Sequence, residues 1–235
     1  NNFKANNPEI RVCIVGKYTK VADAYLSIEE AISHACTYNQ VKPKVEIIDA
    51  EDIEEVGAEK FLKGAKAIIV PAGWGSRGFN GMIQAIRYAR ENKIPYLGIG
   101  FGMQLALVEF GRNVVGLDGA NTTEIDPDTD FPVIDVMKEQ KKVLNNGVNT
   151  RIGAYNCVLD PESKAAKLYG KELVSERHRH SYEFNTAFLD KYTKEGMLFA
   201  GMNPDSKLVE IIEIKSHPYF VGVIFEPENK SRPNK

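Results

Sequence analysis

The residues best placed for chemistry surround one short stretch, IPYLGIGFGMQLAL, at positions 94–107. Its apolar run, Ile94–Ile99, is long enough for a buried parallel strand, and a helical pattern begins at Phe101. Three glycines at alternate positions accompany the junction, so the pattern predicts a strand, a sharp turn and a helix. Such a turn holds its apex residue in a strained conformation above a helix N-terminus, which favours a negatively charged nucleophile. The apex residue here is Gly100, which supplies no nucleophilic atom.

Two carboxylates and two histidines in the C-terminal half are further candidates for catalysis. Glu226 and Glu228 occupy alternate positions, so in an extended segment their side chains point the same way. Such a pair could share a proton, bind a cation or perform acid–base chemistry, whereas in an irregular segment both would be solvated. His178 and His180 lie in the polar stretch SERHRHSYEFN, at 175–185, where they could act in catalysis or form ion pairs.

The elements that must position these groups alternate between strands and helices in the first half of the chain. The pattern predicts strands over 10–15, 44–48, 67–70 and 94–99, and helices over 22–38, 51–62, 78–92 and from position 101 onward. After position 116 it predicts strands over 133–136, 151–159, 198–202, 208–214 and 219–225, a short helix over 162–169, and a stretch at 175–185 that is too polar for the core. The expected fold class is α/β: a flavodoxin-like, doubly wound, mostly parallel sheet with an antiparallel C-terminal addition.

Composition narrows the class of protein further. With 235 residues, 43% of them hydrophobic, we expect one domain over 10–235 and a linker or tag remnant over 1–9. A formal net charge of −2 gives no reason to expect a nucleic-acid or membrane partner. Cys13, Cys36 and Cys157 are scattered, which predicts reduced core thiols in a cytoplasmic protein. No residue spacing indicates a metal site, and no cofactor is expected.

Six segments, taken together, resemble a known family. In chain order they are VGKYTKVADAYLSIEEAISHA, PAGWGSRG, IPYLGIGFGMQLALVEFGRN, ANTTEID, ERHRHSYEFN and HPYFVGVIFEPENKSRP. Their order and spacing resemble the glutaminase domain of CTP synthase, a class I glutamine amidotransferase, over Ile10–Pro233. The resemblance implies a Cys–His–Glu triad that hydrolyses glutamine. It also implies that ammonia travels to a synthetase domain, which aminates UTP using ATP.

The sequence departs from that family at the triad itself. By resemblance, Gly100 stands at the position of the nucleophilic cysteine and Glu226 at that of the histidine, and only Glu228 is retained. A thioester needs a thiolate and a base to form it. An unperturbed carboxylate, with a pKa near ~4, is a poor replacement for histidine. The resemblance therefore implies a degenerate triad.

The glutamine pocket is altered as well. Ser181 stands where the family has an arginine that helps to hold the carboxylate of glutamine, and Ala72 replaces a glycine beside the oxyanion hole. Trp74, the only tryptophan, is expected in the pocket wall. By resemblance, the positions that bind substrate are Ala72, Gly73, Trp74, Phe101, Gln104, Glu124 and Ser181. Because several site positions differ together, natural divergence is a better explanation than an engineered knockout.

Three functions are compatible with these losses, so whether the chain is an enzyme stays open. The first is a catalytically silent domain, with a small-molecule ligand in the former glutamine pocket. It would be a structural or regulatory partner of a CTP-synthase-type synthetase domain or subunit and would form a homo-oligomer. The second is a repurposed hydrolase for another C–N or amide bond, with Glu226, Glu228 and His178 or His180 as acid–base groups. The third is a working glutaminase, which needs a nucleophile that the sequence does not offer.

Overall fold

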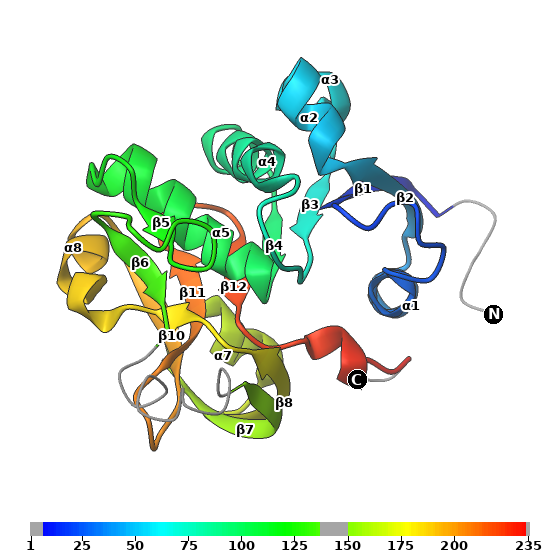
Figure 1. Cartoon of the computed structure of the whole chain (residues 1–235). Coiled ribbons are helices and arrows are strands. Elements are labelled where there is room, and N and C mark those ends of the chain that lie inside the picture. Colours follow the sequence, from blue (N-terminus) through cyan, green and yellow to red (C-terminus); the bar gives the residue numbers. More distant parts are fainter. Residues whose placement is uncertain (1–6, 137–149, 234–235) are drawn as a thin grey trace.

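A nine-stranded mixed sheet organises the protein, whose computed structural model describes residues 7–136 and 150–233 (Figure 1). The strand order is β2-β1-β3-β4-β12-β11-β10-β7-β8. The parallel half contains β2 (Lys42–Asp49), β1 (Glu9–Gly16), β3 (Ala67–Val70), β4 (Tyr96–Ile99) and β12 (Phe220–Val223). The antiparallel half adds β11 (Val209–Ile214), β10 (Met197–Met202), β7 (Arg151–Leu159) and β8 (Leu173–His180). This arrangement confirms the predicted α/β class with its antiparallel addition.

Helices cover both faces of the parallel half, as the alternation of strands and helices predicts. One face carries α1 (Leu26–Tyr38), and the other carries α2 (Ala50–Val56), α3 (Ala58–Leu62), α4 (Phe79–Glu91) and α5 (Phe101–Phe110) (Figure 1). The single helix expected over 51–62 is two helices, because Gly57 has a φ of 95° that no right-handed helix contains. The helix expected from position 22 begins at Leu26, after a series of turns.

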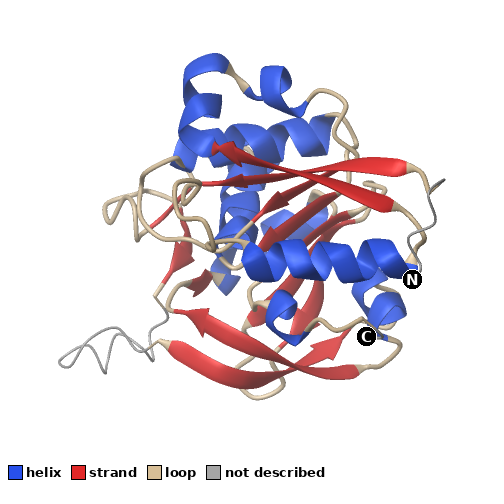
Figure 2. Cartoon of the chain, turned by 90° about the vertical axis from the view of Figure 1, so that its right-hand side faces the viewer, coloured by secondary structure: helices blue, strands red, loops and turns tan. Residues whose placement is uncertain are grey.

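The strands of the large sheet twist strongly from one edge to the other (Figure 2). A smaller sheet pairs β5 (Asn121–Thr122), β6 (Pro132–Asp135) and β9 (Glu183–Phe184). The other helices of the described residues are α7 (Lys164–Tyr169) and α8 (Leu189–Lys194), with helical turns η1 (Gly111–Val115), η3 (Thr186–Phe188) and η4 (Pro227–Lys230). No helix in the described ranges is long and apolar enough to cross a membrane.

The polar stretch at 175–185 corrects one expectation. It supplies most of β8 and all of β9, and the even-numbered residues of β8 are buried although three of them are polar. They are tolerated inside because hydrogen bonds and ion pairs compensate for burial. The alternation of exposed and buried residues identifies this stretch as a strand. Its overall polarity led to the wrong expectation that it lies outside the core.

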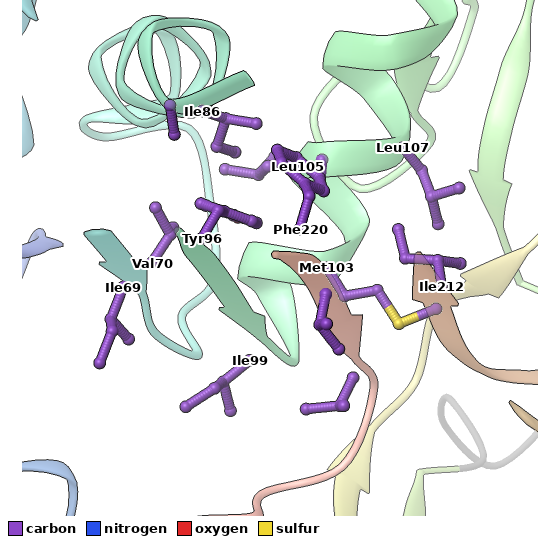
Figure 3. Close-up of a cluster of buried hydrophobic side chains, with 14 of the residues drawn as sticks. Ile69, Val70, Ile86, Tyr96, Ile99, Met103, Leu105, Leu107, Ile212 and Phe220 are labelled. Carbon is purple, nitrogen blue, oxygen red and sulfur yellow. The ribbon is translucent and has the colours of Figure 1, made fainter. Parts of the chain in front are cut away.

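Helix α5 is the centre of the core, and all ten of its residues are buried. Its apolar side chains pack on the neighbouring strands in a cluster that contains Met103, Leu105, Leu107, Tyr96 and Phe220 (Figure 3). A Cβ added to Gly102 would lie 2.0 Å from the carbonyl oxygen of Val70, so only glycine lets the helix approach β3 this closely. Close backbone packing therefore fixes the junction between β4 and α5, and with it the site described next.

Candidate functional site

The strand–turn–helix predicted at position 100 is present. Strand β4 ends at Ile99 and α5 begins at Phe101, while Gly100 between them has φ 55° and ψ −109°. The Gly100 N–H donates to the carbonyl oxygen of Val223 at 2.7 Å. This is the backbone shape of a nucleophile elbow. The scaffold that presents a nucleophile is thus built, and its apex carries a hydrogen atom.

Ala72 occupies part of the space that a side chain at the apex would need. A Cβ added to Gly100 would lie 3.2 Å from the Cβ of Ala72. Where the family resemblance has glycine at 72 and cysteine at 100, this chain has alanine and glycine. The Cβ atom is therefore at position 72 in this chain, and by resemblance at position 100 in the family.

A buried lysine holds the loop that follows β3. The Lys17 Nζ donates to the carbonyl oxygens of Trp74 at 2.7 Å and Gly75 at 2.6 Å, and it lies 4.7 Å from the ring centroid of Phe101. Burial lowers the pKa of Lys17 to about 8. The Gly75 N–H donates to Glu124 Oε1 at 2.8 Å. These contacts tie the loop to the first turn of α5 and to the segment that carries Glu124.

One small cavity gathers the substrate-binding positions proposed from the sequence. Its volume is about 20 Å³, enough for one or two water molecules. It is lined by Ala72, Gly73, Trp74, Gly100, Phe101, Gln104, Glu124, Arg179, His180, Ser181, Tyr182, Ile224 and Glu226. We call it the elbow cavity. Sequence reasoning missed Arg179 and Tyr182, because it did not recognise β8 and so could not place the side chains around its end. It predicted the strand that leads to Ile224 but did not assign that residue to the site.

The two carboxylates of the C-terminal segment do not share this cavity. Glu226 lines it and accepts a hydrogen bond from Asn229 Nδ2 at 2.7 Å. Glu228 instead lines a larger, mainly apolar cavity of about 360 Å³ beside α1. Burial, with a smaller contribution from the charge of Glu226, raises the pKa of Glu228 to about 7. The extended segment assumed from the sequence is absent, because Pro227 begins the helical turn η4.

His178 and His180 belong to a buried network that the sequence did not predict as a unit. Arg151 donates to Glu183 at 2.9 Å and to Glu210 at 2.8 Å. His178 Nε2 pairs with Glu210, and His180 Nε2 lies 2.8 Å from Glu183 Oε1. Burial raises the pKa of Glu183, but His180 and Arg151 outweigh it and hold this pKa below its ordinary value. The alternation of glutamate and histidine in ERHRH was the available signal for a shared buried face.

Only His180 of the two histidines reaches the elbow cavity. The ring of His178 lies in the core, 5.1 Å from Tyr155 and 5.6 Å from Phe225, measured between centroids. The three thiols are buried on other elements, at Cys13 in β1, Cys36 in α1 and Cys157 in β7. None of them lines the elbow cavity.

Comparison with known proteins identifies the family. The profile of glutamine amidotransferase class-I matches residues 20–235. CTP synthase of Caldanaerobacter subterraneus subsp. tengcongensis is 50% identical over 232 residues, which are 98% of this chain and 43% of that protein. CTP synthase of Clostridium acetobutylicum is 47% identical over 234 residues, 100% of this chain and 44% of that protein. The chain belongs to the class I glutamine amidotransferases.

Solved structures show which type of class I amidotransferase this domain resembles. The glutaminase domain of Trypanosoma brucei CTPS, solved with bound acivicin, superimposes with a TM-score of 0.90 at 35% identity and covers 96% of this chain and 88% of that one. A glutamine amidotransferase of Thermotoga maritima, at 14% identity and a TM-score of 0.59, covers 93% of this chain and 76% of that one and shares the fold alone. The domain is therefore of the CTP-synthase glutaminase type and spans less than half the length of the curated relatives it matches.

Proposed function

We propose that this amidotransferase domain does not hydrolyse glutamine and acts as a structural or regulatory partner of a cytoplasmic CTP-synthase-type synthetase. The observation that carries the proposal is the elbow itself, whose backbone holds the nucleophile geometry while Gly100 offers no thiol. Loss of a triad's nucleophile leaves only the small residual catalysis of oriented binding. Glu226, at the histidine position, adds a negative charge where a thiolate would have to form.

The small volume of the elbow cavity supports the same proposal. Glutamine has far more atoms than a cavity of about 20 Å³ admits, and the arginine expected to hold its carboxylate is replaced by Ser181. The Ser181 hydroxyl lies 2.9 Å from the Thr150 hydroxyl. Substrate binding and chemistry are thus weakened at separate positions, as expected of a domain that has lost a reaction.

The alternative of a repurposed hydrolase receives less support. It requires Glu226, Glu228 and a histidine at one cavity. Glu228 lies in the apolar cavity, and His178 is paired with Glu210 in the core. Only Glu226 and His180 remain at the elbow cavity, and Nε2 of His180 faces Glu183. We therefore keep the silent domain as the conclusion.

The test uses the domain joined to its synthetase. We expect CTP to form from UTP and ATP when ammonium chloride is supplied, and no CTP when glutamine is the only nitrogen donor. Ammonia release from glutamine by the domain alone should equal the buffer blank. An electrophilic glutamine analogue should leave no covalent adduct detectable by mass spectrometry. Glutamine-supported CTP formation, or turnover abolished by an adduct on any of the three cysteines, would overturn the proposal.

A further inference from the structure

Both ring nitrogens of His178 face hydrogen-bond acceptors. Nδ1 lies 3.0 Å from the carbonyl oxygen of Glu176, and Nε2 lies against Oε2 of Glu210. A carbonyl oxygen can only accept, so Nδ1 carries a proton. His178 and Glu210 are fully buried, and two buried acceptors that faced each other without a proton would both be unsatisfied. A second proton therefore lies between Nε2 and Oε2.

The second proton belongs to the imidazole ring and not to the carboxylate. Arg151 Nη2 donates to the other oxygen of Glu210, Oε1, at 2.8 Å. A guanidinium group is always charged, and a charged donor at this distance favours the ionised form of the carboxyl group. His178 is therefore an imidazolium, in which both nitrogens are donors. The pair holds one proton more than a neutral histidine beside an ionised glutamate.

With that proton the buried network has no net charge. Its anions are Glu210 and Glu183; burial raises the pKa of Glu183, but His180 and Arg151 hold it below its ordinary value, so this carboxylate is ionised. Its cations are Arg151 and His178. His180 adds no charge, because its Nε2 bonds to Glu183 and a second proton on Nδ1 would have no acceptor among the described residues. Two cations thus balance two anions, which avoids the cost of an uncompensated buried charge.

The other titratable groups around His178 leave this balance intact. The carboxylate of Glu176 has its own cation, because Lys230 Nζ lies 3.6 Å from its Oε2. On β7, the uncharged ring of Tyr155 meets that of His178 edge-on, at 5.1 Å between centroids. Burial raises the pKa of the Cys157 thiol to about 12, so this thiol is neutral as well. The two arginines of β8 are exposed on the opposite face of the strand.

We propose that His178 and Glu210 form a buried proton-binding site, occupied at neutral pH, which fastens the end of β8 to the rest of the molecule. The network that the proton completes joins β7, β8 and β11 of the large sheet to β9 of the small sheet. Without the proton it would carry one uncompensated negative charge, and residues 181–184 would lose their anchor. The inference goes beyond the proposed function, because it holds whether or not glutamine is hydrolysed.

Nitrogen-15 NMR of the histidine rings reads the site directly, since the chain has only 4 histidines. At about pH 7.5, above the ordinary histidine pKa of ~6.5, both ring nitrogens of His178 should give the signals of N–H groups. Assignment through the backbone needs no variant. Glu210→Gln offers an amide donor in place of the carboxylate, so Nε2 of His178 should become a bare acceptor. Glu55→Gln, the same substitution at an exposed position of α2, should leave both protons in place.

Urea unfolding of paired variants separates the charge of His178 from its packing. His178→Gln removes one cation and leaves a buried anion uncompensated, so it should lower the folding equilibrium constant at least about a hundredfold. Adding Glu210→Gln restores neutrality and should recover most of that loss, which a role in packing alone would not do. A bare ring nitrogen in His178 of the parent protein at about pH 7.5, or no recovery in the double variant, would overturn the proposal.

Discussion

Two cavities adjoin the segment that runs from Glu226 into η4, and they differ in volume and in the polarity of their walls. The elbow cavity is small, with a wall that is polar and apolar in equal parts, and Glu226 beside it is hydrogen-bonded to Asn229. The cavity beside α1 is large and lined mainly by aliphatic side chains, and it receives Glu228. Two carboxylates separated by one proline thus face different surroundings. The local turn, and not the spacing of acidic residues, decides which chemistry each can join.

The largest effect that would break this contrast is the return of glutaminase activity. We expect it in a variant combining Gly100→Cys, Glu226→His, Ser181→Arg and Ala72→Gly, and not after Gly100→Cys alone. Nucleophile and base act as one unit, and losing either from a comparable triad costs about 10⁶ in rate. A lone thiol beside Glu226 would also have a raised pKa. Ala72→Gly removes the methyl group that would lie 3.2 Å from the new Cβ.

Ammonia release from glutamine measures this prediction, with the four single substitutions as controls. Each single variant should equal the blank, so the effects should be far from additive. Turnover by the Gly100→Cys variant alone would contradict the role assigned to Glu226. If the combined variant is folded and silent, Glu228, held in the apolar cavity, cannot reach the restored histidine. The two cavities would then be separate even when the residues of the triad are restored.

The next effect concerns Glu228, whose pKa is about 7 in the folded protein against an ordinary value of 4.5. Between these values the folded state keeps a proton that the unfolded state has released. Stability therefore falls as pH rises from about 4.5 to about 7. Glu228→Gln should raise the free energy of unfolding by about 3 kcal/mol at pH 8 and leave it nearly unchanged at pH 4. Urea unfolding at both pH values measures the difference.

Glu55→Gln, the same substitution at an exposed position of α2, controls for the loss of a charge. If Glu228→Gln has the same effect at both pH values, the Glu228 carboxyl is solvated and the two cavities do not differ in the way described. If it destabilises the protein at pH 8, the ionised carboxylate has a partner in the folded state. Either result would show that Glu228 is not held as a neutral group in the apolar cavity.

Sequence reasoning reached the fold and the elbow because both depend on patterns that are local in the chain. Alternating strands and helices specify the parallel half, and glycines around Gly100 specify the turn. It failed where burial depends on partners far away in sequence. The polar run 175–185 supplies most of β8 and all of β9, because residues distant in the chain provide its ion pairs: Arg151 pairs with Glu183 and Glu210 pairs with His178. It also could not foresee that Pro227 turns Glu228 away from Glu226.

A smaller effect tests the steric contact between Ala72 and a side chain at position 100. Gly100→Ala should lower the free energy of unfolding by about 1–2 kcal/mol, because φ is 55° and the new Cβ would crowd Ala72. In an Ala72→Gly background this cost should be smaller by about 0.5 kcal/mol, which a double-mutant cycle resolves. Gly116→Ala has a φ of 77° with no atom within 4 Å of the added Cβ. Its cost should be the same in both backgrounds, and coupling to Ala72 there would show that the cycle measures something other than contact.

The smallest effect concerns the loop that forms one wall of the elbow cavity. Lys17→Met removes two hydrogen bonds to carbonyl groups but also removes a buried charge, so the net change in stability should be within about 1 kcal/mol. The emission of Trp74 should change more clearly, since the Lys17 Nζ holds its carbonyl group. The pKa of Lys17 is lowered to about 8, against an ordinary value of 10.5. The folded protein therefore releases this proton before the unfolded chain does, and stability rises with pH from about 8 to about 10.5.

Emission of the parent protein should accordingly change with a midpoint near pH 8. The same titration should be absent in Lys17→Met and retained in Lys20→Met, which removes a nearby lysine whose side chain is exposed. A midpoint near pH 8 that persists in Lys17→Met would assign the titration to another group. A flat profile in the parent would mean that the loop keeps its shape without the charge. The hydrogen bond from the Gly75 N–H to Glu124 would then be what fixes the loop that forms the wall of the elbow cavity. The buried charge of Lys17 would not be needed for the shape of that cavity.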